Sequence, residues 1–218
     1  MKYAYLILVF TLALFSCNNE TTTSEEVTDS QTIEATALSG DKAINIDQST
    51  IFWKGYKLLG NHTGKINLKE GNIQFKDGAI TGGNFVVDMT SIVVTELMDN
   101  GEEEEEEEEG EDDKSDLAGH LMHTDFFGSE QFPLATFEIT KSVKNENVFQ
   151  ITGNMTIKDI TKEVSFDATL ENNSIHSEIK INRTDFGIKY GSGSFFENLG
   201  DNVIKDEFDL IVKLALTD

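Results

Sequence analysis

Two histidines lie three residues apart within residues 119–139, GHLMHTDFFGSEQFPLATFEI, a segment that also holds the only proline of the chain. Residues at this spacing share a helix face, so His120 and His123 could hold a metal ion together, with Asp125 as a third ligand and His62 from another strand. Partly exposed or hydrogen-bonded histidines explain the same pattern. Divalent-metal binding by these side chains and the acidic residues nearby is therefore kept as an alternative hypothesis.

The chain offers no recognisable catalytic arrangement. Gly191-Ser192-Gly193-Ser194 has the glycines of a nucleophile turn but is followed by two phenylalanines, which is more typical of a flexible hairpin. Carboxylates are so numerous that no pair stands out as an acid and base. We therefore predict that the protein is not an enzyme and needs no cofactor, and we rank an enzymatic role last among the hypotheses.

Charge excludes another class of function. The net charge is −23, from 40 acidic and 17 basic residues, and no basic stripe is present that could contact phosphates, so we expect no nucleic-acid partner. Glu102 to Asp116 holds 12 of the acidic residues against Lys114 alone. Like charges in series repel one another, so residues 100–116 are interpreted as a solvated loop insertion.

The N-terminal segment predicts export and anchoring. Residues 1–16 contain a lysine followed by an apolar run that is too short to span a bilayer comfortably, which is typical of a signal peptide. The single cysteine, Cys17, follows in a context that resembles the bacterial lipobox. Two acyl chains on Cys17 would give stable membrane attachment. Residues 17–42 are rich in Thr, Ser and Glu and are predicted to form a flexible tether.

Residues 43–218 show the period-two hydrophobic pattern of half-buried antiparallel strands. The Asp77-Gly78 pair favours a tight hairpin between two of the rows. About eight such strands, with one candidate helix at 116–127, predict an all-β fold, an antiparallel up-and-down β-barrel, because closure removes exposed edges. A two-sheet sandwich is the alternative. The apolar rows include Ile66 and Leu68; Phe85, Val87 and Met89; Phe149, Ile151, Met155 and Ile157; and Phe208, Leu210, Val212 and Leu214.

The interior of such a barrel is wide enough to fill with side chains or to hold one slender ligand. Phenylalanine supplies 15 of the aromatic residues, mostly at inward positions. The small inward residues Gly153, Ala168 and Ser177 are expected to leave space. Burial of one CH₂ contributes about 0.8 kcal/mol, so a chain of about ten carbons would gain on the order of 8 kcal/mol before ordering costs. An apolar chain therefore needs no catalytic group to bind.

With these residues in view, the chain from residue 44 to residue 216 resembles the YceI-like family of periplasmic lipid-binding proteins. The departures are Gln48 in place of a histidine, Asp159 in place of a turn glycine, and the acidic insertion at 100–116. The stretches that carry the resemblance are Trp53-Lys54-Gly55, His62-Thr63-Gly64, Gly83 to Ile92, Gly119-His120-Leu121, Asp125-Phe126-Phe127, Phe132-Pro133, Gly153 to Lys162 and Asn182 to Gly187.

The resemblance implies a lipocalin-like barrel that binds a polyisoprenoid or similar amphiphile, in a lipoprotein of the bacterial cell envelope that is periplasmic or surface-exposed. The segment with His120 and Phe126 would line or close the lipid entrance, and His62 or His120 would bind a polar head-group. A homodimer is left open. The residues expected to contact lipid in the cavity and at its entrance are Trp53, His62, Phe85, Val87, His120, Leu121, Phe126, Phe127, Phe137, Phe166 and Phe186.

Overall fold

The computed structural model describes residues 38–98 and 111–217. The expected signal peptide, Cys17, most of the tether and the glutamate run at 102–109 lie outside the described residues. No helix in the described ranges is both long enough and apolar enough to cross a membrane.

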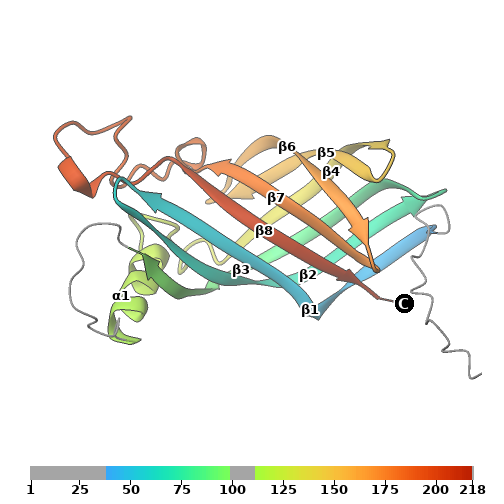
Figure 1. Ribbon diagram of the computed structural model, residues 1–218, viewed down its shortest axis with the longest axis horizontal. Helices are drawn as coiled ribbons and strands as arrows, with labels where there is room; N and C mark the ends of the chain where they lie inside the picture. The colour runs from blue at the N-terminus through green and yellow to red at the C-terminus, as the bar shows by residue number, and fades with distance from the viewer. Residues whose placement is uncertain (1–37, 99–110, 218) are drawn as a thin grey trace, which may run out of the picture. The chain divides into compact units, whose positions relative to one another are not determined.

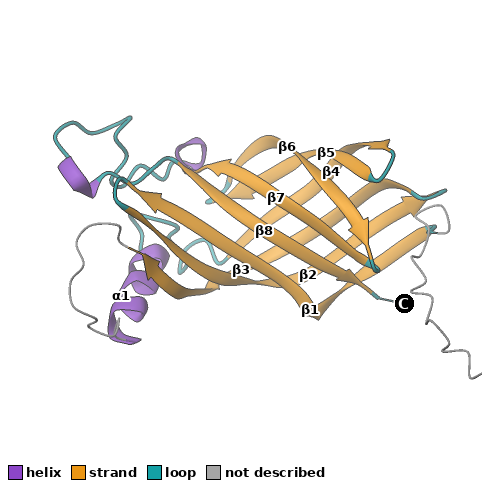
Figure 2. Ribbon diagram, viewed as in Figure 1, coloured by secondary structure: helices purple, strands orange, loops and turns teal. Residues whose placement is uncertain are grey.

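The described chain forms a closed antiparallel barrel of eight strands, each hydrogen-bonded to the next, with β8 returning to β1 (Figures 1 and 2). The predicted up-and-down β-barrel is confirmed, and the sandwich alternative is wrong because the sheet closes on itself. The strands are β1 (Gly40–Lys57), β2 (Gly60–Lys76), β3 (Ala79–Met98), β4 (Leu134–Asn145), β5 (Val148–Ile157), β6 (Ile160–Glu171), β7 (Ser174–Asn182) and β8 (Glu207–Leu216).

Helix α1 (Glu111–Met122) separates β3 from β4. It begins and ends five residues earlier than the sequence predicts. After Met122 the chain turns sharply, because the amides of His123 and Phe126 bond to the carbonyls of His120 and His123 at 3.0 Å. Pro133 lies just before β4, where its missing N–H costs nothing, and its carbonyl accepts a bond from the amide of Met89.

The alternation of the sequence is reproduced in the strands. In β5 the buried residues fall at every second position, from Phe149 to Ile157, and the polar residues between them face outward. The tight turns use residues in the left-handed region, as at Asp77-Gly78 with φ values of 50° and 72°. Asp159, the residue that replaces a glycine, also lies there with φ 58°.

The barrel has two unlike ends. At one, which we call the closed end, lie the start of β1, the β2–β3, β4–β5 and β6–β7 turns and the end of β8. At the other, the mouth, lie the β1–β2 and β5–β6 turns, α1 with residues 123–133, and residues 183–206, which join β7 to β8. Figure 1 shows α1 and the long red-orange connection at the end opposite the C-terminus.

At the mouth two of the ladders stop short of the strand ends. β3 pairs with β4 only from Gly83 to Asp88, and β6 pairs with β7 only from Ala168 to Glu171. Helix α1 packs against β3, and a short 3₁₀ helix (Arg183–Phe186) contacts β6. Loops and helices, rather than continuous strands, therefore form the walls of the mouth.

Candidate functional site: a cavity inside the barrel

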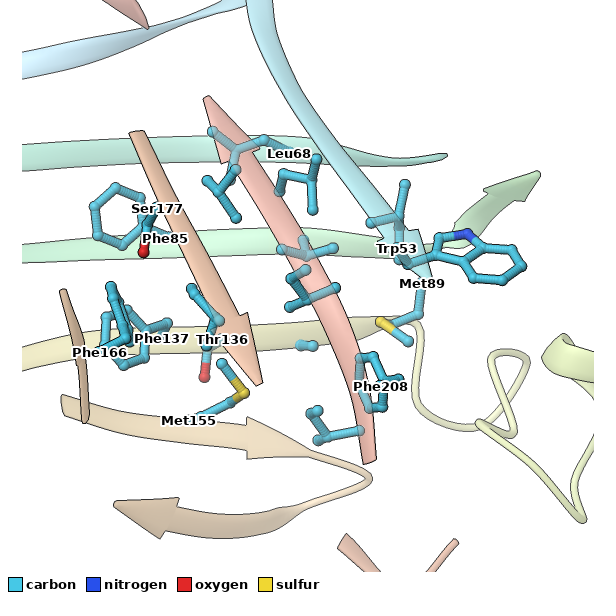
Figure 3. A pocket seen from close by; sticks show the side chains of 18 of the residues that line it. Trp53, Leu68, Phe85, Met89, Thr136, Phe137, Met155, Phe166, Ser177 and Phe208 are labelled. Carbon is cyan, nitrogen blue, oxygen red and sulfur yellow. The ribbon is translucent and has the colours of Figure 1, made fainter. Parts of the chain in front are cut away.

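The inward rows of the strands do not meet at the barrel axis. They enclose a cavity of about 200 Å³ to which all eight strands contribute, together with α1, residues 126–127 and residues 183–205. Its wall is almost wholly apolar (Figure 3). An apolar cavity of about 150 Å³ is known to stay dry and to bind a hydrocarbon, because water needs polar partners that such a wall lacks. This cavity therefore favours a hydrocarbon over water.

Toward the closed end the cavity wall is uneven, because Ile80 and Ile175, beside the turns there, line it, whereas residues on other strands do not. Ile73 and Ile151 still lie on its wall, but the next inward residues, Phe75 and Phe149, do not. Phe149 is 0% exposed and Phe75 is 3% exposed, and Leu216 is buried with them in the same core. These side chains form a plug of close-packed hydrocarbon at the closed end. We therefore expect a ligand to enter from the mouth, where loops and helices form the walls.

Three phenylalanines, from β3, β4 and β6, lie together on the cavity wall. The rings of Phe85 and Phe137 are stacked with centroids 6.3 Å apart, and Phe166 lies 5.4 Å from Phe137 (Figure 3). Ala168 and Ser177 also line the cavity, as expected of small inward residues. The cavity wall thus combines aromatic rings with small side chains.

The expectation for Gly153 is wrong, because this glycine does not lie on the cavity wall. A Cβ atom there would come within 2.4 Å of the Phe137 ring and 2.4 Å of the Glu138 carbonyl. The room that Gly153 leaves is therefore taken by Phe137. Its small size positions an aromatic ring instead of enlarging the cavity.

The mouth carries a second aromatic cluster. Phe126 and Phe127 line the cavity, with centroids 5.2 Å apart, and Phe127 is edge-on to Phe208 of β8 at 6.4 Å. His120 stacks edge-on against Tyr190 at 4.5 Å and against Phe126 at 6.0 Å. The segment after α1 is thereby packed across the barrel opening.

Arg183 is buried at the mouth and binds the backbone of the segment between β7 and β8. It is 2% exposed, and its Nε and two Nη atoms donate to the carbonyls of Lys205, Ile188, Tyr190 and Ile204 at 2.8–3.1 Å, while Nη2 also reaches Asp206 at 3.4 Å. All the donors of the guanidinium are used, so Arg183 fixes the loop instead of binding a head-group. Burial lowers the pKa of Arg183 and Asp206 opposes this shift.

Asp206 completes this arrangement. Burial would raise the pKa of its carboxyl, but hydrogen bonds from Ser192 and Ser194 and the charge of Arg183 outweigh that effect, so the pKa lies below its ordinary value. The same balance holds at Asp209 on β8, where burial is outweighed by the bonds from Lys180, at 2.7 Å, and from Tyr56. The pKa of both carboxyls, Asp206 and Asp209, therefore lies below its ordinary value.

Lys158, in the β5–β6 turn, fastens the segment after α1 to the barrel. Its Nζ donates to the carbonyl of Phe126 at 2.6 Å and to that of Thr124 at 3.3 Å. Burial lowers the pKa of Lys158, and the charge of Asp125 acts in the opposite direction. The position of Phe126 at the entrance therefore depends on a lysine from a different hairpin.

The candidate metal residues form a small hydrogen-bonded group instead. His123 Nδ1 lies 2.8 Å from Asp125 Oδ1, and His120 Nε2 lies 3.5 Å from Asp125 Oδ2. The bond from His123 lowers the pKa of Asp125. Among residues 38–98 and 111–217, no group of three or more His, Cys, Asp or Glu side chains could hold a metal ion.

The structure places most of the predicted lipid contacts on the cavity wall. His62, on β2 opposite Gly55, and His120 are not among the lining residues, and Phe186 is buried in the core at 1% exposure. Those that line the cavity are Trp53, Phe85, Val87, Leu121, Phe126, Phe127, Phe137 and Phe166.

Sequence reasoning missed several residues that shape the site. Met89, Met155 and Leu210 stood in the apolar rows but were not singled out, and all three line the cavity. Arg183 opens one of the motifs on which the family resemblance rests, yet its role was not foreseen. A lone arginine followed by Phe186-Gly187 was the available signal, because a guanidinium beside apolar residues needs many acceptors.

Trp53 is the one indole of the chain and lies on the wall toward the mouth, near Met89 and Phe208 (Figure 3). It packs on Gly64, where a Cβ atom would lie 2.5 Å from the ring. Its Nε1 is buried and has no hydrogen-bond partner in the described part of the chain. Leaving this buried donor without an acceptor costs the folded state free energy.

Solved structures with the same barrel are known. The crystal structure of BcnA from Burkholderia cenocepacia matches with a TM-score of 0.60 at 16% identity, covering 80% of this chain and 99% of that one. A polyisoprenoid binding domain from Saccharophagus degradans, implicated in plant cell wall breakdown, matches with a TM-score of 0.53 at 13% identity, covering 79% and 95%. At these identities the likeness concerns the fold.

Sequence comparison gives the family. Protein YceI from Escherichia coli O157:H7 is 32% identical over 84 residues, which are 34% of this chain and 44% of that protein, so the chain spans less than half the length of the curated relatives it matches. The family model of the YceI-like domain matches residues 43–216, nearly the whole of the barrel. The chain therefore belongs to the YceI-like family.

Proposed function

We propose that the barrel binds one long apolar chain, a polyisoprenoid or a similar amphiphile, and that the protein carries or sequesters this lipid at the bacterial cell envelope. The observation that carries the proposal is the apolar cavity, which is lined by residues of all eight strands. The related fold of a polyisoprenoid binding domain supports the ligand class.

The energetics suit such a ligand. Each CH₂ that leaves water contributes about 0.8 kcal/mol, and the cavity wall requires no compensating hydrogen bonds along the chain. The polar end of the amphiphile would lie toward the mouth, because the apolar plug leaves it no acceptor or donor at the closed end.

The cellular setting of the proposal comes from the N-terminal sequence. A signal peptide at residues 1–16, acylation at Cys17 and a tether to residue 42 would hold the barrel close to a membrane that supplies its ligand. Metabolic labelling with an alkyne fatty acid tests this part, since the label should be lost in Cys17→Ala. Labelling that persists in Cys17→Ala would contradict it.

Binding is tested by extracting the purified full chain with organic solvent, identifying lipids by mass spectrometry, and titrating the stripped protein with a long-chain isoprenoid alcohol. In Ala168→Phe the new ring would fill the cavity, and uptake should fall by at least about tenfold because several CH₂ groups lose their place. Ala135→Phe, also on the wall, is a second variant should Ala168→Phe fail to fold.

The matched control is Ala43→Phe, which adds the same ring at an exposed position of β1 that is not on the cavity wall. It should take up lipid as the unmodified chain does. No lipid in any preparation and no uptake of added isoprenoid would overturn the proposal. Equal uptake by all the variants would show that any lipid binds outside the barrel.

A further inference from the structure

Large exposed apolar side chains gather at the mouth of the barrel. The β1–β2 turn presents Leu58 and Leu59, and the segment between β7 and β8 presents Tyr190, Phe195 and Phe196, with exposed fractions of 44–55%. We call these five residues the mouth patch. The turns of the closed end are polar by contrast, with Asp77-Gly78 and Asn172-Asn173 at two of them.

The mouth patch is continuous with the cavity entrance. The amide of Leu58 donates to the carbonyl of Val203 at 3.0 Å, and the amide of Lys205 donates to that of Tyr56 at 2.8 Å, so the two loops are joined by backbone bonds. Ile204 and Lys205, at the junction, line the cavity. A molecule leaving the cavity therefore passes directly beside the mouth patch.

Backbone hydrogen bonds hold the turn that carries the exposed Phe195 and Phe196. The amides of Phe195 and Phe196 both bond to the carbonyl of Ser192, which is 0% exposed. Arg183 binds the carbonyls of Tyr190 and Ile204 on either side of this turn. The apolar rings are thus presented outward by a well-bonded loop, although exposing them to water is unfavourable.

The charges around the mouth patch suit a lipid surface of low net charge. In residues 188–206 the cations Lys189 and Lys205 are balanced by Glu197 and Asp201, while Asp206 is paired with Arg183. Helix α1 at the same end adds Asp113 and Asp116 against Lys114. Lys189 Nζ lies 4.4 Å from the centroid of the Phe195 ring. Aromatic and leucine side chains flanked by lysines are typical of segments that rest in a bilayer interface.

We propose that the mouth docks on a lipid bilayer by inserting the mouth patch among the head-groups, so that a lipid passes between bilayer and cavity without crossing water. This inference rests on the proposed lipid binding, because only an apolar ligand needs such a route. The occupant of the patch is the bilayer itself. Because residues 188–206 carry little net charge and α1 beside them is acidic, docking should favour neutral lipids and weaken when anionic lipid is added, most strongly at low salt.

Docking is tested with the full chain carrying Cys17→Ala, which removes both the acyl anchor and the native thiol, on phosphatidylcholine and phosphatidylethanolamine vesicles. A polarity-sensitive fluorophore on Phe196→Cys should shift to the blue and be quenched by spin-labelled phosphatidylcholine. The same probe on Val143→Cys, which is equally exposed at 47% on β4 toward the closed end, should do neither. Leu59→Cys provides a second labelled position should Phe196→Cys fold poorly.

Transfer gives the second readout. Leu58→Asp with Phe196→Asp should slow lipid exchange between vesicles and barrel by about tenfold, since two apolar anchors are lost. Equilibrium uptake of lipid added from ethanol should be unchanged, because neither residue lines the cavity. Val143→Asp should alter neither quantity.

The outcomes separate the two proposals. Failure of the unmodified chain to take up lipid from ethanol would overturn the proposed function. Normal uptake with an unquenched probe at position 196 and unchanged exchange rates would overturn membrane docking alone. A blue shift that grows with protein concentration in the absence of vesicles would assign the mouth patch to a second copy of the chain and also overturn docking.

Discussion

The two ends of the barrel are closed by different means. At the closed end, Phe149, Phe75 and Leu216 come from three strands and fill the interior with hydrocarbon, and the turns outside are short and polar. At the mouth, Arg183 and Lys158 tie loops together through backbone carbonyls, and large apolar residues remain exposed outside. Buried apolar side chains therefore stabilise the closed end, and side-chain hydrogen bonds to loop carbonyls stabilise the mouth.

This difference separates stability from function within one barrel. Phe149 and Phe75 near the closed end are buried and do not line the cavity, so they contribute mainly to the free energy of folding. At the mouth, hydrogen bonds from Arg183 and Lys158 hold the loops in position. They do not fill the interior, so a cavity remains beside the loops. Among the described residues, the buried charged side chains Arg183 and Asp209 lie toward the mouth.

The largest effect on stability is expected from Phe149→Ala at the closed end. The ring is fully buried, so its removal should lower the free energy of unfolding by about 3–5 kcal/mol. Phe137→Ala, on the cavity wall, should cost clearly less because that ring already borders open space, but it should weaken lipid binding. Urea unfolding of lipid-free protein measures both. An equal loss of unfolding free energy in Phe149→Ala and Phe137→Ala would contradict the distinction between the closed end and the cavity wall.

Arg183→Gln should weaken the mouth and spare the closed end. Several carbonyls in residues 188–206 lose their donors, at a cost of about 2–4 kcal/mol. Hydrogen exchange should accelerate at Ser192 and Ile204 and stay slow at Phe149. Arg183→Lys should not rescue the protection, because an ammonium cannot reproduce the planar fork. Uniform acceleration over the whole barrel would contradict this division.

Gly153→Ala should push Phe137 toward the cavity, since the added Cβ would lie 2.4 Å from its ring. We expect a loss of about 1–3 kcal/mol together with weaker lipid uptake. Gly119→Ala on α1 is the control, because no atom lies within 4 Å of a Cβ built there, and it should stabilise by up to about 1 kcal/mol. Thermal unfolding and a lipid titration check both variants. Unchanged uptake in Gly153→Ala would show that Phe137 does not border the ligand.

Acid should loosen the mouth before the closed end. The pKa of Asp206 is lowered on folding, so its contribution to stability is complete above the ordinary carboxyl pKa near 4 and is lost as the pH falls through the lower pKa of the folded state. Tyrosine fluorescence and exchange rates in residues 188–206 should report this loss. Asp206→Asn should have a lower free energy of unfolding at neutral pH, and this free energy should fall less as the pH is lowered. An identical acid profile in both proteins would contradict the assignment.

The smallest effect is expected at the histidine group. His123 and Asp125 are exposed by 65% and 42%, so His123→Ala should change the free energy of unfolding by less than about 0.5 kcal/mol despite the 2.8 Å contact. Titration with zinc checks the remaining metal hypothesis at the same time. Micromolar binding that is lost in His120→Ala with His123→Ala would show that these side chains do more than fasten the mouth.

The strands could be predicted because their physics is local. Alternation in rows such as Phe149 to Ile157 reports which face is buried, and Asp77-Gly78 reports a tight turn. These signals were enough to predict a barrel of about eight strands, and the structure has a closed barrel of eight. Most aromatic residues predicted to contact lipid also lie on the cavity wall. In the middle of the barrel, a side chain that points inward borders the cavity.

The mouth could not be predicted in the same way. The roles of Arg183 and Lys158 depend on carbonyls that come close only after folding, and such contacts leave no periodic signal. Gly153 looked like a source of space, but its neighbour across the strands is aromatic and takes that space. His62 and His120 were chosen by residue type, and neither lies on the cavity wall.

The central claim is that an apolar chain lies inside the barrel with its polar end toward the mouth, and Trp53 can test it directly as the single tryptophan of the protein. Long-chain alcohols brominated at successive positions would be titrated while its fluorescence is recorded. Bromine near the hydroxyl should quench Trp53 strongly, and bromine at the far tip should quench it little. Saturable binding without quenching from any position, or strongest quenching from the tip, would contradict the account.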